Sequence, residues 1–195
     1  MAYATQPSVA IFPSADADQP TTTLSNPNSL GAPLVFLVVG AGPVRSRVML
    51  PERPNGATGW VANSDLRFYQ DDWKVVVSLS RRVLTVLDAG RVVETDTVTV
   101  GSAASPTPTG SFYVTELVSS TDPGGPYGPY AFGLSDFSDT YTEFAGGPGQ
   151  VAIHGTDRPD LLGQAASDGC VRLPDATVSA LARVLPVGTP VDIGP

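Results

Sequence analysis

Residues 151–173 read VAIHGTDRPDLLGQAASDGCVRL, and this stretch holds the single histidine, His154, and the single cysteine, Cys170, of the 195-residue chain. His154 ends an apolar run that is typical of a strand, and Cys170 follows sixteen residues later in a Ser-Asp-Gly-Cys turn. A free thiol has a pKa of about 8.5 and needs a base or a cation beside it to act as a nucleophile. The pattern therefore indicates a cysteine nucleophile with a histidine base.

The residues around Cys170 favour acyl transfer. Gly169 permits a tight turn, so that the amides of Gly169 and Cys170 could both point at a developing oxyanion. The planar guanidinium of Arg172 suits a substrate carboxylate. Each residue also has a plainer interpretation, because a lone cysteine is more often a small buried hydrophobe and a lone histidine a hydrogen-bonded strand residue.

Short runs rich in valine and threonine predict a mainly β fold for the rest of the chain. WKVVVSLS (73–80), RVLTVLDAG (82–90) and RVVETDTVTV (91–100) are β-prone, and Asp88-Ala89-Gly90 between the last two indicates a hairpin. The 20 glycines and 19 prolines indicate many turns.

The C-terminal half adds further strands and one helix. SPTPTGSFYVTEL (105–117) places a turn before a strand, and TPVDI (189–193) reads as a closing strand. The apolar spacing predicts one short helix over 175–185, which Asp175 can cap. Residues 121–149 are rich in glycine, proline and aromatic residues, among them Tyr130, and predict a long loop that could serve as a lid.

The chain divides into three predicted segments. Residues 1–32 are rich in polar and turn-forming residues and read as a leader or linker with at most one edge strand. Residues 33–71 read as a small accessory β module that begins with a buried strand over 33–44, and residues 72–195 as the catalytic domain.

Composition argues against several functions. The net charge of -8 and the lack of a basic patch argue against nucleic acid as a partner. One cysteine offers no Cys-x-x-Cys for zinc and no intramolecular disulfide. The longest apolar run, 33–44, is too short to span a bilayer, and no secretory signal is visible at the start of the chain.

The motif HGT (154–156), a gap and SDGCVR (167–172) together resemble the signature of the L,D-transpeptidase catalytic domain family, the YkuD type. Residues 75–93 and 100–114 are similar to the family's opening hairpins and Pro-Thr-Gly turn, and GTPVDI (188–193) is similar to its closing strand. The resemblance covers about residues 73–193. LPERPNGATGWV, which precedes it, is similar to the piece that leads into this domain in actinobacterial members.

The resemblance implies a β-sandwich or barrel with a loop lid and no metal or cofactor. It implies that Cys170 attacks the L,D-peptide bond of a peptidoglycan stem tetrapeptide and forms an acyl-enzyme, with His154 as the base and the amides of Gly169 and Cys170 as the oxyanion hole. A stem peptide then accepts the acyl group and a 3-3 cross-link forms. It also implies an exported protein of the periplasm or cell wall that binds carbapenem-type inhibitors. Our candidates for substrate binding are Arg172, Ser167, Tyr130 and Gly155.

Two positions depart from the family pattern. Members commonly carry a second histidine where this chain has Asp168, and some carry serine where it has Gly155. A carboxylate that faced the thiol would raise the pKa of Cys170. We therefore expect Asp168 to point away from the sulfur, and a backbone carbonyl to orient His154.

Three other functions stay open. An L,D-carboxypeptidase would use the same residues with water as acceptor, and a peptidoglycan-binding module would keep the fold without turnover. A thiol redox sensor would lack a resolving cysteine, since Cys170 is alone.

Overall fold

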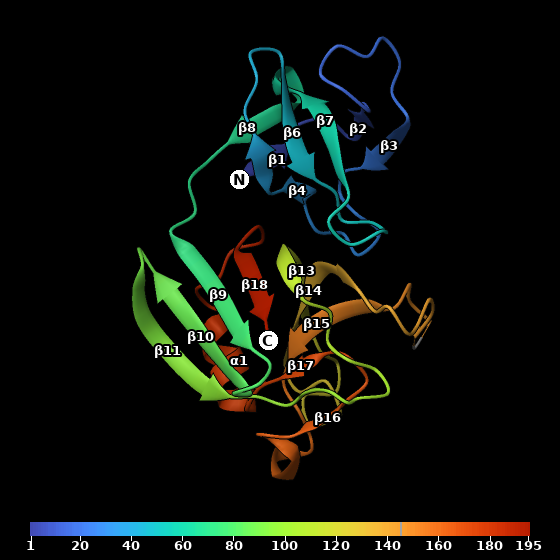
Figure 1. The fold of residues 1–195 in the computed structure, drawn as a ribbon. Helices are drawn as coiled ribbons and strands as arrows, with labels where there is room; N and C mark the ends of the chain where they lie inside the picture. Colours follow the sequence, from blue (N-terminus) through green and yellow to red (C-terminus); the bar gives the residue numbers. More distant parts are fainter. Residues whose placement is uncertain (145) are drawn as a thin grey trace.

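The computed structural model describes residues 1–144 and 146–195, and it consists of two bodies, one above the other in Figure 1. The strands are β1 (Ala2–Ala4), β2 (Ser8–Ile11), β3 (Thr22–Ser25), β4 (Val35–Phe36), β5 (Val38–Gly40), β6 (Arg45–Met49), β7 (Thr58–Ala62), β8 (Leu66–Phe68), β9 (Trp73–Ser78), β10 (Val83–Asp88), β11 (Arg91–Thr97), β12 (Val100–Gly101), β13 (Gly110–Ser119), β14 (Tyr130–Phe137), β15 (Gln150–His154), β16 (Ala165–Ser167), β17 (Val171–Arg172) and β18 (Pro190–Gly194). The helices are the 3-10 helices η1 (Asn63–Asp65) and η2 (Pro159–Leu161) and the α-helix α1 (Asp175–Leu181).

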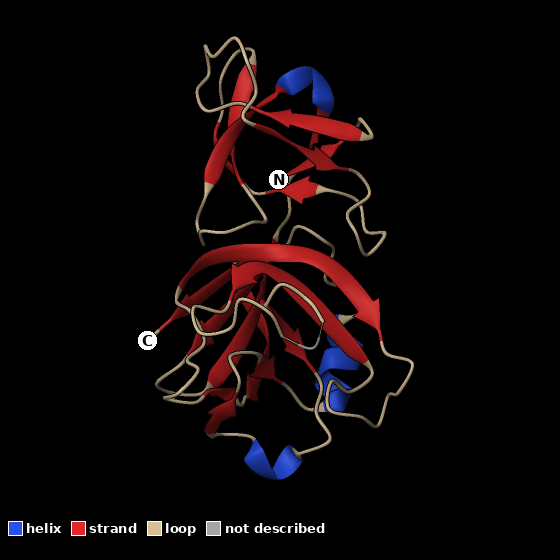
Figure 2. Cartoon of the chain, turned by 90° about the vertical axis from the view of Figure 1, so that its right-hand side faces the viewer, coloured by secondary structure: helices blue, strands red, loops and turns tan. Residues whose placement is uncertain are grey.

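The larger body is built on a curled eight-stranded sheet in the order β11-β10-β9-β18-β13-β14-β15-β17. Most neighbours are antiparallel, but β18 joins β9 in parallel and β17 joins β15 in parallel. Alternate residues of these strands point inward, so that valines such as Val75 and Val77 are buried in one core. Figure 2 shows the sheet from the side, with the helix packed beside it. The predicted mainly β fold is confirmed.

The hairpin predicted at 88–90 joins β10 and β11. Ala89 and Gly90 both have positive φ, 48° and 77°, which is the backbone of a type I′ turn. The strand predicted at 189–193 is β18, which lies in the middle of the sheet.

The predicted helix is shorter than expected, and its cap differs. α1 ends at Leu181, and turns carry the chain on to Leu185, which is buried in the same core as Val178. The prediction that Asp175 caps α1 is wrong, because Pro174 holds the N-cap position and no side chain caps it. Asp175 Oδ1 instead accepts the Thr156 amide at 2.8 Å.

The smaller body contains more of the N-terminus than the sequence predicts. Residues 1–32 were expected to be a leader or linker with at most one edge strand, but they supply β1, β2 and β3. Ala2, Val9 and Ile11 are buried with Phe36 of β4. The expected buried strand at 33–44 is divided into β4 and β5. The limits of the three predicted segments remain a proposal.

The two bodies share a small apolar contact. Tyr113 of β13 is fully buried against Val35 and Met49 of the smaller body. Its hydroxyl lies 3.3 Å from the Met49 carbonyl, and Tyr69 donates a hydrogen bond to the Val187 carbonyl at 3.0 Å. Tyr113 is therefore the main aromatic anchor between the bodies.

No helix in the described residues is both long and apolar enough to cross a membrane.

Replacing the anchor should weaken the whole molecule. We expect Tyr113→Ala to lower the free energy of unfolding by about 3–5 kcal/mol, because it removes a fully buried ring and leaves a cavity. Tyr113→Phe should cost only about 1 kcal/mol, because it keeps the ring and loses one long hydrogen bond. Urea unfolding followed by tryptophan fluorescence measures both changes, and equal losses in the two variants would contradict this account.

Candidate active site

His154 and Cys170 line the same cavity because β15 and β17 pair in parallel. The register places Ile153 beside Val171 and His154 beside Arg172. Continued by one residue, this register sets Cys170 next to Ala152. Side chains two residues apart lie on the same face of a strand, so Cys170 and Arg172 share a face of the sheet with His154. The structure thus joins the two residues that the sequence singled out.

His154 is almost fully buried, with 2% of its surface exposed. Its Nδ1 lies 2.6 Å from the Gly155 carbonyl oxygen, which can only accept, so Nδ1 carries the proton and Nε2 is the basic nitrogen. Burial lowers the pKa of His154 to about 4, while the Gly155 hydrogen bond opposes this shift. The imidazole is therefore neutral at pH 7, and the prediction that a backbone carbonyl orients it is confirmed.

Burial also raises the pKa of the Cys170 thiol above its usual value. A hydrogen bond to the Ala152 backbone and the charge of Arg172 act in the opposite direction, and the carboxylates of Asp136 and Asp168 raise the pKa further. Asp168 makes the smallest of these contributions, and its residue is exposed. In the resting protein the thiol and the imidazole are both neutral.

The turn that presents Cys170 is held from three sides. Gly169 has a φ of +120°, which glycine tolerates and other residues rarely adopt. Ser167 Oγ donates to the Cys170 carbonyl at 2.6 Å and accepts the Gly169 amide at 3.2 Å. Ser105 Oγ donates to the Asp168 carbonyl and Thr107 Oγ1 to the Gly169 carbonyl, each at 2.8 Å. The Pro-Thr-rich segment before β13 thus acts as a support for the turn.

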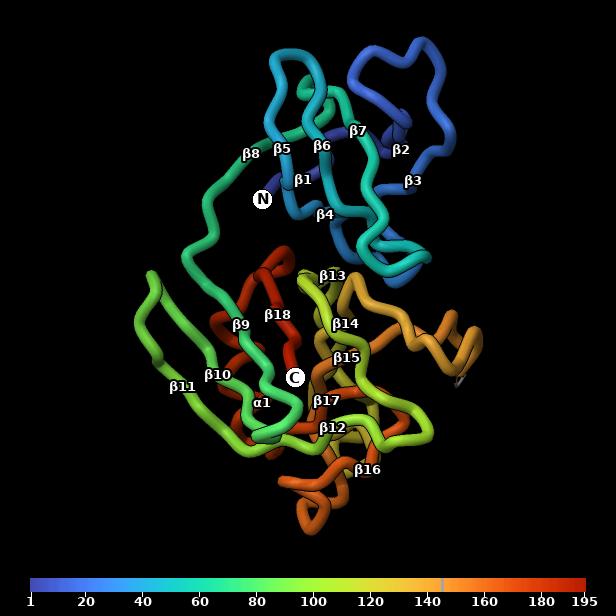
Figure 3. The backbone as a smooth tube through the Cα atoms, viewed as in Figure 1, coloured from blue at the N-terminus to red at the C-terminus, as the bar shows by residue number. Residues whose placement is uncertain are grey.

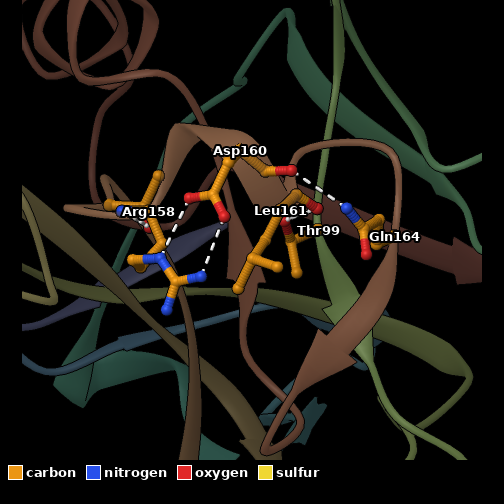
Figure 4. A network of polar contacts seen from close by, with 6 residues as sticks. Thr99, Arg158, Asp160, Leu161 and Gln164 are labelled. Atoms are coloured by element: carbon orange, nitrogen blue, oxygen red, sulfur yellow. Dashed lines mark hydrogen bonds and ion pairs between the residues drawn. The ribbon is translucent and has the colours of Figure 1, made fainter.

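The connection from His154 to Cys170 is braced by its own polar contacts (Figure 4). Arg158 and Asp160 form two hydrogen bonds of 2.8 and 2.9 Å, and Gln164 donates to the Asp160 carbonyl at 2.9 Å. Thr99 Oγ1 donates to the Leu161 carbonyl at 2.7 Å. These contacts give the fifteen-residue connection between His154 and Cys170 a defined path.

A cavity of about 270 Å³ opens onto the pair. His154, Asp168, Cys170 and Arg172 line it. Arg172 Nε is buried and has no hydrogen-bond partner in the described part of the chain. A guanidinium beside the thiol with an unused donor is suited to an anionic or carbonyl group of a ligand.

The remaining wall of the cavity comes from residues outside the motif, and sequence reasoning missed most of them. Tyr127 is 41% exposed, and its ring centroid lies 5.0 Å from that of His154. The other lining residues are Pro126, Ser138, Tyr141, Phe144, Gly149, Gln150 and Val151. They lie in the stretch 121–149 or follow it directly, and Ala145 of that stretch lies outside the described residues. The prediction that 121–149 is one long loop lid is wrong for 130–137, which form β14 inside the eight-stranded sheet. Only the aromatic and glycine content of the stretch signalled a role.

The other predicted substrate residues lie apart from this cavity. Tyr130 lines a neighbouring cavity of about 580 Å³, which shares Tyr127 and Gln150 with the first. Gly155 is buried so closely against Gly128 and Asp175 that a Cβ atom would overlap both. Ser167 is 1% exposed and is used by the turn. Substrate contacts by Tyr130, Gly155 and Ser167 therefore remain predictions.

Among the described residues, no group of three or more histidine, cysteine or carboxylate side chains could hold a metal ion.

Comparisons with known proteins identify the family of the chain. Residues 72–193 match the family model YkuD, described as the L,D-transpeptidase catalytic domain. The Bacillus subtilis (strain 168) protein YkuD, an L,D-transpeptidase by name, is 34% identical over 125 residues. That match covers 64% of this chain and 68% of the Bacillus protein, so about a third of the relative lies outside it.

Solved structures share the fold at low identity. L,D-transpeptidase 3 from Mycobacterium tuberculosis is 15% identical with a TM-score of 0.55, and the match covers 83% of this chain and 94% of that one. The structure of the same protein with a faropenem-derived adduct is 16% identical in sequence with a TM-score of 0.54, and the match again covers 83% of this chain and 94% of that one. Bd1075 from Bdellovibrio bacteriovorus is 22% identical with a TM-score of 0.50, and the match covers 64% of this chain and about half, 48%, of Bd1075.

The family match covers the larger body up to residue 193, including the turn of Cys170 and the strand of His154. The chain therefore belongs to the L,D-transpeptidase catalytic domain family of the YkuD type.

Proposed function

We propose that this protein is a peptidoglycan L,D-transpeptidase that forms 3-3 cross-links through an acyl-enzyme on Cys170. The observation that supports the proposal most directly is the pairing of β15 with β17, which brings one thiol and one neutral imidazole to the same cavity. Family membership supplies the reaction class. The donor and acceptor are stem peptides, and the protein works outside the cytoplasm, in the periplasm or cell wall.

In the first half-reaction, Cys170 Sγ attacks the carbonyl carbon of the L,D-peptide bond while His154 Nε2 takes the thiol proton. The oxygen becomes an oxyanion, which amides of the turn stabilise. The Cys170 amide serves this role, and the Gly169 amide can join it by giving up its long bond to Ser167 Oγ. The intermediate collapses, the C–N bond breaks, and His154 returns the proton to the leaving amine.

In the second half-reaction, an amine of another stem peptide attacks the thioester. His154 accepts the proton of this amine, the C–S bond breaks, and the thiol recovers its proton. A new amide bond is thus formed at the expense of the thioester, with no metal or redox step. Arg172, with an unused Nε donor beside the thiol, is suited to bind a carboxylate of the peptide.

The product distinguishes this proposal from its competitors. We expect purified protein to convert a stem tetrapeptide into cross-linked dimer, and Cys170→Ala to form none, as measured by mass spectrometry of the muropeptides. Tripeptide without dimer would instead identify an L,D-carboxypeptidase. A protein that forms neither product, and adds no carbapenem to Cys170, would be a binding module. The faropenem-derived adduct of the Mycobacterium tuberculosis protein makes a β-lactam a suitable probe.

The acylation rate should vary with pH as expected for a neutral Cys170 thiol and a neutral His154 imidazole. The pKa of His154 is lowered to about 4, so the base is lost only when the pH falls below that value. The pKa of Cys170 is raised, so the thiol stays protonated at neutral pH. We expect the rate of carbapenem acylation to be constant from about pH 5 to about pH 8 and to fall about tenfold per unit below pH 4. An acid limb near pH 6.5 would contradict a neutral pair, and circular dichroism at each pH is the control for unfolding.

The support under the nucleophile turn should matter for the same rate. Thr107 is 4% exposed, donates to the Gly169 carbonyl and accepts the Gly101 amide at 2.8 Å. We expect Thr107→Val, which keeps the shape but loses both bonds, to slow acylation by about tenfold and to lower the free energy of unfolding by about 1–3 kcal/mol. Thr107→Ser, which keeps the hydroxyl, is the control. A Thr107→Val protein that is acylated at the wild-type rate would rule out the supporting role.

A further inference from the structure

The connection between β6 and β7, in the smaller body, reaches the larger body (Figure 3). Arg53 and Asn55 lie in this connection and make hydrogen bonds across the boundary. Their partners are the end of β14 and the chain that follows it. We call residues 138–144 and 146–149 the rim segment, because Ser138, Tyr141 and Gly149 of this segment line the cavity of Cys170.

Asn55 uses its whole side-chain amide on the end of β14. Its Nδ2 donates to Asp136 Oδ1 and to the Phe137 carbonyl, both at 2.8 Å, and its Oδ1 accepts the Phe137 amide at 2.9 Å. Asp136 has no exposed surface, and burial raises its pKa to about 8. The three bonds hold the last residues of β14 in one position.

Arg53 donates hydrogen bonds to carbonyls near both ends of the rim segment. Its Nη1 donates to the Ser138 carbonyl at 2.9 Å, and its Nη2 donates to the carbonyls of Tyr141 at 2.9 Å and Pro148 at 3.1 Å. The guanidinium carbon lies 5.2 Å from the centroid of the Phe137 ring. A planar cation with several fixed donors is suited to gather carbonyl oxygens that would otherwise repel one another.

Hydrogen bonds within the rim segment hold its two ends together beside this guanidinium. The Ser138 amide donates to the Gly149 carbonyl at 2.8 Å, and Ser138 Oγ accepts the amides of Thr140 and Tyr141. Gly149 has a φ of +70°, and a Cβ there would overlap the Tyr141 carbonyl and approach Arg53 Nη2 to 3.1 Å. The position of the cavity wall therefore depends on where Arg53 holds these carbonyls.

A second link across the same boundary ends at the same cavity. Asn28 of the smaller body donates to Glu116 Oε2 at 2.9 Å, and Glu116 Oε1 accepts Gln150 Nε2 at 2.8 Å. Gln150 lines the cavity of Cys170. Two separate chains of hydrogen bonds thus run from the smaller body to the wall of the cavity.

We propose that Arg53 and Asn55 are positioning residues of the active site, through which the smaller body sets the shape of the substrate cavity. The inference rests on the proposed function for its kinetic test. It assigns a role to the smaller body: the working enzyme is both bodies together. Neither residue lines the cavity, so each acts through the rim segment and the end of β14.

Arg53→Ala, Asn55→Ala and the double variant test this proposal. The reactive pair is held by β15 and β17 and not by Arg53, so the loss should fall on binding. We expect KM for tetrapeptide, and the half-saturating concentration of carbapenem, to rise about tenfold in each single variant, with kcat changed by less than about threefold. Because both residues hold the same wall, the double variant should lose less than the product of the two single losses. Arg53→Lys keeps the positive charge but replaces the planar guanidinium and its fixed N–H donors with a single ammonium group. It should therefore restore only part of the lost binding.

Arg45→Ala is the matched control. Arg45 also donates to two carbonyls, those of Ala15 and Ala17, and lies 3.5 Å over the Phe12 ring, but all these partners belong to the smaller body. It should lower the melting temperature about as much as Arg53→Ala and leave KM unchanged. Equal KM values in the two variants would show that Arg53 is merely structural and would overturn the proposal.

Hydrogen exchange keeps this inference separate from the proposed function. In Arg53→Ala we expect the amides of Ser138, Thr140 and Tyr141 to exchange at least tenfold faster, while the amides of β15 stay protected. This readout needs no substrate. If the wild-type protein neither reacts nor binds carbapenem, the proposed function fails while the exchange rates still decide the role of Arg53. Unchanged protection of the rim amides would overturn the positioning role whatever the activity.

Discussion

The parallel pairing of β15 with β17 is the constraint on which the active site depends. β17 has only two residues, yet its register with β15 brings Cys170 to the strand that carries His154. Thr99 secures the other side of β17, because its amide donates to the Arg172 carbonyl at 3.0 Å and its carbonyl accepts the Arg172 amide at 2.9 Å. A short strand between two partners has little freedom to slip, since a shift of one residue would turn Cys170 to the opposite face. The reactive geometry is thus a consequence of sheet register.

Burial of the pair has a chemical consequence. The same enclosure that lowers the pKa of His154 raises that of Cys170, so the two shifts together favour thiol and imidazole over thiolate and imidazolium. Arg172 favours the charged form of Cys170 but opposes a charged His154, since its positive charge lowers the pKa of both. In the proposed mechanism the thiol would become nucleophilic as its proton moves to His154 during attack, and the buried site would avoid the cost of a resting ion pair.

Local patterns in the sequence were sufficient for the hairpin at 88–90 and the closing strand, and the motif singled out His154 and Cys170, which the fold brings to one cavity. Each of these depends on residues close together in the chain or on a motif, and Ala89-Gly90 adopts the turn that its sequence favours. The cap of α1 was mispredicted because Asp175 has a partner in Thr156, nineteen residues away. The strands in residues 1–32 were missed because a partner such as Phe36, and not local hydrophobicity, stabilises them. Tyr127 could not be placed, since only the fold brings its ring to His154.

The site combines parts of different origin, and this explains which residues a local pattern can reveal. The groups proposed to make and break bonds lie at the end of β15 and in the turn before β17, where close packing holds them within the tolerance that acyl transfer requires. The wall of the cavity is made of turns, whose backbone carbonyls have few partners of their own. These carbonyls need hydrogen-bond donors from another part of the chain, and the guanidinium of Arg53 and the amide of Asn55 provide them from the smaller body. A motif can therefore identify the chemistry of this protein, whereas the shape of its cavity depends on contacts between residues about ninety positions apart.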